Sequence, residues 1–110
     1  MKKLLIALSV LATTQIAMAA ATPITKIKDI YVYADYIVMK MENKHTNPGC
    51  TKSTADEFLY LATNSEGGKK MYSAALSAYV SGKKVRFGFS GCSTWGASTI
   101  PTAYGISLLK

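Results

Sequence analysis

Residues 69–89 decide the fold of this chain, and they read KKMYSAALSAYVSGKKVRFGF. In the first part of this stretch apolar residues recur three to four positions apart, which predicts a helix over residues 69–81. After Gly82 apolar and polar residues alternate, which predicts a strand from Val85 to Gly91. The residues that we expect this helix to turn toward a sheet are Tyr72, Leu76, Tyr79 and Val80, with Met71, Ala75 and Ala78 beside them.

Sequence signals for both ends of the helix are present. Ser65 or Asn64 can cap its start, because a short polar side chain there accepts a hydrogen bond from a free backbone N–H group. Gly82 lies where a helix commonly ends in the left-handed conformation. The helix is therefore predicted to be a single, well-bounded element, and it is the only convincing helix after the first nineteen residues.

Strand patterns surround this helix on both sides. Residues 27–42 are rich in β-branched and aromatic side chains and have Ala34 and Asp35 at their middle, which predicts a β-hairpin. Residues 43–55 and 92–101 have the composition of loops. The strand at 56–62 is apolar on both faces, which predicts burial on both sides or a contact between subunits. The predicted strands cover residues 26–33, 36–42, 56–62, 85–91 and 102–109.

The predicted order of elements is therefore β-β-β-α-β-β. Five strands with a helix between the third and the fourth are typical of a small, partly open Greek-key barrel of the oligonucleotide- and oligosaccharide-binding (OB) type. A β-rich α+β sandwich built from the same elements is the alternative. The chain has 110 residues, enough for one such domain after removal of a leader.

The amino terminus has the pattern of a secretory signal peptide. Two lysines precede the apolar run Leu4–Leu11, and residues 17–19 place alanine at the −3 and −1 positions. Cleavage after Ala19, or one or two residues later, leaves residues 20–110 as one periplasmic or secreted domain. The alternative is an uncleaved membrane anchor, but polar residues at 13–15 interrupt the run before it reaches ~20 apolar residues.

The domain without its leader is moderately basic. The whole sequence has a net charge of +7, and loss of Lys2 and Lys3 leaves eleven basic and six acidic residues. Only Lys69-Lys70 and residues 83–86 group these cations, so nucleic acid is not an expected partner. Anionic glycans, lipid head groups and cell surfaces are more usual partners of a basic exported protein. Solubility alone is the other explanation of the charge.

Cys50 and Cys92 are the only cysteines, and an even number in an oxidising compartment predicts one disulfide. A reactive or metal-binding pair is disfavoured, because there is no C-x-x-C spacing and only one histidine. That histidine, His45, follows Lys44 in a polar loop and is expected to be solvated. Neither a G-x-S-x-G motif nor a catalytic pair of carboxylates is present, so we expect no enzyme, no cofactor and no metal site.

The second half of the chain resembles a known family. Residues 74–87 (AALSAYVSGKKVRF), Cys92 with Trp95 close behind, and residues 101–107 (PTAYGIS) are similar to the glycan-binding B subunits of bacterial AB-type toxins, such as the cholera and subtilase toxins. The likeness implies secretion, one OB-type barrel and a pentameric ring. It covers roughly residues 71–109, and Cys50 departs from the pattern because the first cysteine of the cholera-type subunit lies near the mature amino terminus. Nothing in the chain identifies a catalytic A-type subunit as its partner.

Trp95 is the only tryptophan, and residues 91–99 around it are rich in Gly, Ser and Thr. An exposed indole flanked by hydroxyl groups suits stacking on a sugar ring. The resemblance gives Trp95 the same role, because a tryptophan after the second cysteine stacks on galactose in cholera-type subunits. The alternative is that Trp95 covers the disulfide or plugs one end of the barrel. The predicted ligand-binding residues are Trp95, Thr94, Ser93 and Tyr36; Tyr33 is a further candidate, and the other tyrosines are expected to pack.

The sequence therefore predicts an exported, non-enzymatic module that binds glycans in the manner of a toxin B subunit. A homo-oligomer is also expected, because strands 56–62 and 102–109 have more apolar side chains than so small a barrel can bury, and apolar edge strands are normally covered. The alternative function is a small periplasmic or secreted structural or protein-interaction domain.

Overall fold

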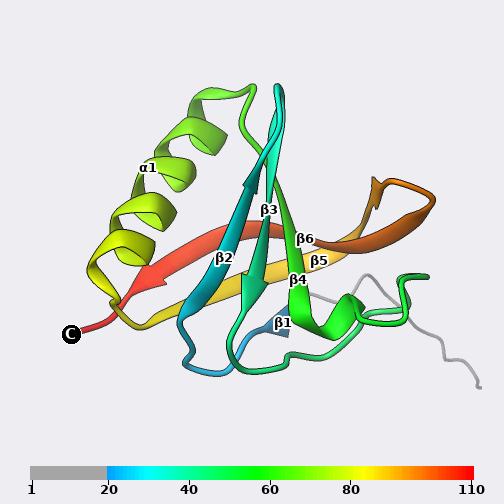
Figure 1. The fold of residues 1–110 in the computed structure, drawn as a ribbon, viewed down its shortest axis with the longest axis horizontal. Helices are drawn as coiled ribbons and strands as arrows, with labels where there is room; N and C mark the ends of the chain where they lie inside the picture. The colour runs from blue at the N-terminus through cyan, green and yellow to red at the C-terminus, as the bar shows by residue number, and fades with distance from the viewer. Residues whose placement is uncertain (1–19) are drawn as a thin grey trace, which may run out of the picture.

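The computed structural model describes residues 20–110, so the predicted signal peptide lies outside the described residues. This part of the chain forms one sheet of six strands and one long helix (Figure 1). A short 3₁₀ helix, Ala55–Glu57, replaces the beginning of the strand predicted at residue 56. The elements in chain order are β1 (Ala20–Ala21), β2 (Ile27–Val32), β3 (Tyr36–Met41), β4 (Phe58–Ala62), α1 (Glu66–Ser81), β5 (Val85–Trp95) and β6 (Ser98–Leu108).

The arrangement of the strands confirms a small β-rich fold with one helix but differs from the predicted five-stranded barrel. The described strands form an open sheet of six in the order β1-β5-β6-β4-β3-β2. All neighbouring pairs are antiparallel except β4 and β6, which are parallel. The extra strand, β1, is only two residues long. Sequence patterns miss it because two alanines carry no strand signal.

Both edge strands of the sheet come from one continuous segment. β1 pairs with β5, while β2 pairs with β3 at the opposite edge. Between them, the N–H group of Thr25 donates to the carbonyl of Val85 at 3.0 Å, and the N–H group of Val85 donates back at 2.7 Å. The two edges of the sheet therefore approach each other at Thr25, where the chain passes from one edge to the other.

Helix α1 has the predicted caps. The Ser65 side chain accepts a hydrogen bond from the N–H group of Gly68 at 3.0 Å, and Gly82 ends the helix in the left-handed conformation with φ of 68°. Glycine adopts this conformation without the steric cost that a Cβ atom brings. The helix begins at Glu66 rather than Lys69, because the Ser65 cap recruits the intervening residues into its first turn.

The predicted inner face of α1 is correct for Met71, Tyr72, Ala75 and Ala78 and wrong for Leu76, Tyr79 and Val80. Small residues face the sheet, with Gly68, Ala75 and Ala78 buried and Met71 and Tyr72 half-buried. A Cβ atom at Gly68 would overlap the carbonyl oxygen of Ala62, so the start of the helix lies directly against the end of β4. The small residues Gly68, Ala75 and Ala78 let the helix lie close to the sheet. Three members of the predicted stripe are exposed instead: Leu76, Tyr79 and Val80.

The main core lies between the sheet and α1. Its largest fully buried side chains include Phe87 and Phe89 of β5 and Leu59 of β4. A second, smaller cluster contains Val38, Phe58 and Ile100. Because neighbouring residues of a strand point to opposite faces, the second cluster lies on the face of the sheet away from α1.

The carboxy-terminal hairpin is longer than predicted. Residues 92–101 are not a loop, because β5 continues to Trp95 and β6 begins at Ser98. The turn between them is Gly96 and Ala97, and Gly96 has a φ of 65°. The predicted exposed edges are also wrong: β4 lies between β3 and β6, and β6 lies between β5 and β4. The backbone edges of both strands are thus paired within the sheet, although Tyr104 and Leu108 of β6 remain exposed.

Candidate functional site

Six aromatic side chains gather on the face of the sheet opposite α1. In β3 and β4 they alternate with core residues: Tyr36 and Phe58 point away from the helix because Ile37 and Leu59 point toward it. Phe58 is buried, and the other five are half-buried or exposed. The aromatic face, as we name this set, comprises Tyr31, Tyr33, Tyr36, Phe58, Tyr60 and Trp95.

Three tyrosines of the aromatic face form a stack. The ring centroids of Tyr33 and Tyr36 are 4.6 Å apart at an interplanar angle of 18°, and those of Tyr36 and Tyr60 are also 4.6 Å apart, at 16°. Tyr36 therefore has a tyrosine on each face of its ring and can offer a ligand only its edge and hydroxyl group. Burial, with smaller effects of Tyr36 and Asp35, raises the pKa of Tyr60, so that hydroxyl group stays protonated.

Trp95 joins this stack to the second cluster. Its ring centroid is 5.0 Å from that of Phe58 and 5.8 Å from that of Tyr31. Its indole Nε1–H donates to the Tyr33 hydroxyl oxygen at 3.1 Å. Trp95 is half-buried, with its ring held by neighbours on three elements. The indole is thus oriented by contacts within the aromatic face.

Two lysines border the aromatic rings. The Nζ atom of Lys52 is 5.2 Å from the Trp95 ring centroid and 5.9 Å from that of Phe58. The Nζ atom of Lys40 is 5.8 Å from the Phe58 centroid and 3.8 Å from Oε1 of Glu57. Both ammonium groups are within the range of cation–π attraction. Glu57 balances the charge of Lys40, whereas Lys52 forms no ion pair within residues 20–110.

The loop that carries Lys52 is fastened to the carboxy-terminal hairpin. The predicted disulfide is confirmed: Cys50 is bonded to Cys92, with Cα atoms 5.6 Å apart. Next to it, the Thr51 N–H group donates to Oγ1 of Thr99 at 2.9 Å, and the Lys52 N–H group donates to the Thr99 carbonyl at 3.1 Å. These bonds hold Lys52 beside Trp95. A disulfide is compatible with an exported protein.

The structure brings together some of the predicted ligand-binding residues. Trp95 and Tyr36 belong to the aromatic face, and Ser93 lies on the same side of β5 as Trp95, with its hydroxyl group bonded to that of Thr102. Thr94 is exposed and points to the other side of the strand. Sequence reasoning missed Tyr31, Phe58, Tyr60, Lys40 and Lys52. Alternation of aromatic and apolar residues in β2 and β4 was the available signal for the three aromatic residues.

No protein-family model, curated protein or solved structure matches the chain. In the part of the chain that the structure describes, no group of three or more His, Cys, Asp and Glu residues could hold a metal ion. The same residues contain no helix that is long and apolar enough to cross a membrane.

His45 is buried, so its prediction as a solvated loop residue is wrong. Its Nε2 atom is 3.1 Å from the carbonyl oxygens of both Ala55 and Phe58, and its ring centroid is 5.1 Å from that of Phe89. Its Nδ1 atom is buried without a hydrogen-bond partner. Desolvation lowers the pKa of His45 against the opposing effects of the two carbonyls and Asp56. The neutral ring, donating from Nε2, therefore holds the segment that leads into β4.

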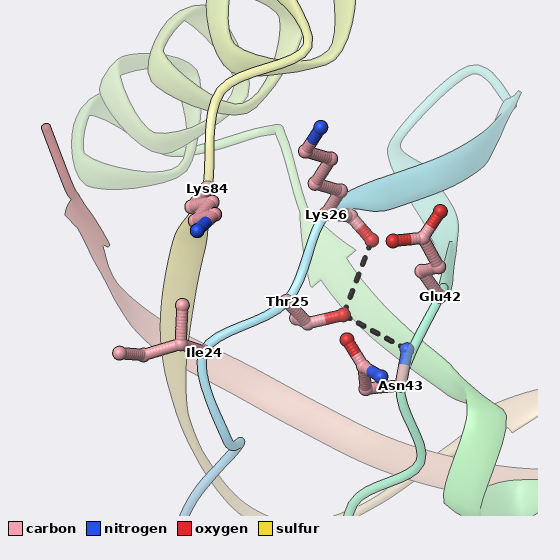
Figure 2. A pocket seen from close by; sticks show the side chains of 6 residues that line it. All are labelled: Ile24, Thr25, Lys26, Glu42, Asn43 and Lys84. Atoms are coloured by element: carbon pink, nitrogen blue, oxygen red, sulfur yellow. Dashed lines mark hydrogen bonds between the residues drawn. The ribbon is translucent and has the colours of Figure 1, made fainter.

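A separate cavity of about 230 Å³ lies where the chain passes between the two sheet edges. Figure 2 shows the Thr25 hydroxyl at its centre, which donates to the Lys26 carbonyl at 3.3 Å and accepts from the Asn43 N–H group at 2.9 Å. Both bonds are internal to the protein. Two lysines and a glutamate contribute opposite charges to the wall, so the cavity has no strong preference for an anion. Its lining residues are Ile24, Thr25, Lys26, Glu42, Asn43 and Lys84.

Proposed function

We propose that this chain is an exported, non-enzymatic module that binds glycans through its aromatic face. The observation that best supports this function is the half-exposed aromatic cluster on the side of the sheet away from the helix, with Lys52 fixed beside Trp95. Sugar rings present apolar C–H faces that pack on aromatic rings, and their hydroxyl groups bind to directional polar partners. The aromatic face offers both kinds of contact over one surface.

Each residue of the site then has a distinct task. Trp95 and the outer faces of Tyr33 and Tyr60 provide stacking surface. Tyr36 contributes its hydroxyl group, because both faces of its ring are occupied by other tyrosines. Lys52 supplies a donor and a positive charge at the rim. Ser93 extends the site along β5, where its hydroxyl group can bind a ligand in addition to Thr102.

We further propose that the domain is of the OB type. Strands β2 to β6 correspond to five strands with α1 between the third and fourth, as in that fold, and β1 is an addition at one edge. The resemblance of residues 71–109 to toxin B subunits agrees with this proposal. Fold alone does not determine function, so the glycan proposal depends on the aromatic face.

A glycan array followed by calorimetry tests the glycan proposal. We expect Trp95→Ala to weaken binding up to about tenfold, because an aromatic stacking contact contributes up to about 1.5 kcal/mol. Tyr79→Ala is the matched control: it removes an exposed aromatic ring on the helix side and should leave affinity unchanged. Failure to bind any multivalent glycan, or unchanged binding by folded Trp95→Ala protein, would contradict the proposal.

The alternative is a protein-interaction domain that uses the same aromatic face. Its Tyr and Trp content favours this alternative, because these residues are enriched in protein interfaces. Capture of one defined envelope protein, lost in Trp95→Ala and insensitive to competing glycans, would favour it over the glycan site. The salt dependence of capture would measure the contribution of Lys52.

We also propose that the chain self-associates, although not through the strands indicated by the sequence. The outer edge of β2 has no neighbouring strand among the described residues and offers unpaired backbone groups to a second copy. Light scattering at micromolar concentration tests this proposal. A monodisperse monomer would contradict it.

A further inference from the structure

The net positive charge of residues 20–110 is concentrated in the second half of the sequence. Residues 20–63 contain five lysines and five acidic residues, so their charges balance. Residues 64–110 contain six basic side chains and only Glu66 as an acid. The six basic residues are all exposed, and none forms an ion pair within residues 20–110: Lys69, Lys70, Lys83, Lys84, Arg86 and Lys110.

Apolar side chains are exposed next to these cations. The exposed fractions are 40% for Leu76, 39% for Tyr79 and 77% for Val80. Leu108, which is 50% exposed, lies opposite the core residue Val85 in the β5–β6 ladder and is therefore on the helix side of the sheet. The helix flank, as we name it, comprises Leu76, Tyr79, Val80 and Leu108.

The exposure of the helix flank follows from how α1 packs. Gly68, Ala75 and Ala78 face the sheet, so the helix approaches its own core with small side chains and leaves larger apolar ones outside. Lys69 and Lys70 are in the first turns of the helix, and Lys83 and Lys84 follow its last residue. The apolar side chains are thus bracketed by cations at both ends of α1.

We propose that the helix flank binds the surface of a bilayer rich in anionic phospholipid. Leu76 and Val80 would enter the boundary between head groups and acyl chains, Tyr79 would lie at head-group depth, and the lysines would contact phosphate groups. The helix that carries three of these residues lies at the outside of the fold (Figure 1), which leaves its outer side accessible to a bilayer. A second copy of the chain is disfavoured at this surface, because it would bring two sets of cations together.

Lipid binding through the helix flank is independent of the proposed glycan site. The flank is on the helix side of the sheet, and the aromatic face is on the other side. A molecule lying on a membrane through α1 would therefore keep its aromatic face free. An experiment that disproves lipid binding therefore does not affect the glycan proposal, and the reverse also holds.

Sedimentation with vesicles tests the proposal. The chain should bind vesicles of equimolar phosphatidylcholine and phosphatidylglycerol, should not bind vesicles of phosphatidylcholine alone, and should dissociate as salt is raised. Lys83→Gln with Lys84→Gln should weaken binding roughly twenty-five-fold, because each lysine near an anionic surface contributes about fivefold. The matched control, Lys28→Gln with Lys44→Gln, removes the same charge from residues 20–63, whose charges balance, and should have a much smaller effect.

A second variant tests the apolar contribution without a change of charge. Leu76→Ser with Val80→Ser should fold, since both side chains are exposed, and should lose most vesicle binding. Equal binding to both kinds of vesicle, or no binding, would overturn the proposal. Vesicle binding by this variant as strong as that of the wild-type protein would also overturn the proposal, because the positive charge alone would then account for the attraction to anionic lipid. If the variant instead converts an oligomer into a monomer, the flank is a contact between copies.

Discussion

The two faces of the sheet are built from the same strands but differ in what covers them. On the helix side, Phe87, Phe89 and Met39 are fully buried beneath α1. On the other side, the small apolar cluster of Val38, Phe58 and Ile100 packs against half-buried aromatic rings of the aromatic face. The comparison separates stability from recognition: substitutions on the helix side should change the free energy of unfolding, and those on the aromatic side should mainly change binding.

The largest expected effect is on the helix side. Phe87→Ala removes a fully buried ring and should lower the free energy of unfolding by about 3–5 kcal/mol. Tyr33→Ala on the aromatic face should cost no more than about 1 kcal/mol, since its ring is substantially exposed. Urea unfolding followed by circular dichroism measures both. Equal losses would show that the aromatic face is part of the core.

Removing the disulfide should affect both stability and the site. Cys50→Ser with Cys92→Ser opens a link between residues 42 apart and should cost about 2–4 kcal/mol. It should also weaken ligand binding at temperatures where the variant is folded, because the loop holding Lys52 beside Trp95 loses one fastening. Calorimetry on the folded variant measures the second effect. Unchanged affinity would show that the bonds to Thr99 alone position Lys52.

Adjacent glycines in α1 offer a finer test of how the helix approaches the sheet. Gly68→Ala should destabilise by about 1–3 kcal/mol, because the added methyl group meets the Ala62 carbonyl. Gly67→Ala meets nothing and should be neutral or stabilise by up to about 1 kcal/mol. Thermal unfolding of the two variants gives the comparison. Similar effects at both positions would mean that the close contact with β4 is not maintained in solution.

The smallest expected effect is a dependence of stability on pH that involves both faces. His45 packs against Phe89 of the core and bonds to the carbonyl of Phe58. Its pKa is lower in the folded chain than the ordinary 6.5, so below about that value the unfolded state takes up a proton more readily. Stability present above pH 6.5 should therefore be lost progressively as pH falls. Unfolding midpoints across this range measure it, and His45→Gln should flatten the curve.

Local signals in the sequence predict several elements well. The Ser65 cap, the Gly82 terminus, the first hairpin and the disulfide are all as predicted. The caps and the hairpin depend on residues that are close together in the sequence, and two cysteines allow only one intramolecular disulfide. The lengths of β5 and β6 are not predicted correctly, because residues 91–99 have the composition of a loop. These residues form strands by pairing with each other, next to the Cys50–Cys92 disulfide.

The inner face of α1 and the full aromatic face depend on distances that the sequence does not encode locally. Periodicity finds the stripe of Leu76 and Val80 but does not show that Ala75 and Ala78 occupy the inner side of the helix and leave it exposed. Trp95 and Tyr36 are identified by type and position. Phe58 and Tyr60 cannot be assigned to a ligand site until it is known which side of the sheet the helix covers. His45 is buried because distant carbonyls need a donor, and no local pattern shows that need.

The position of β6 has a consequence for when the domain can fold. This last strand of the chain is in the middle of the sheet, and β1, the first strand, pairs only with β5. Residues 20–62 can therefore form no more than the β2–β3–β4 meander, with its apolar side uncovered. Pairing between distant segments slows folding. Whenever the chain becomes available amino terminus first, its sheet would therefore stay incomplete until the last strand arrives.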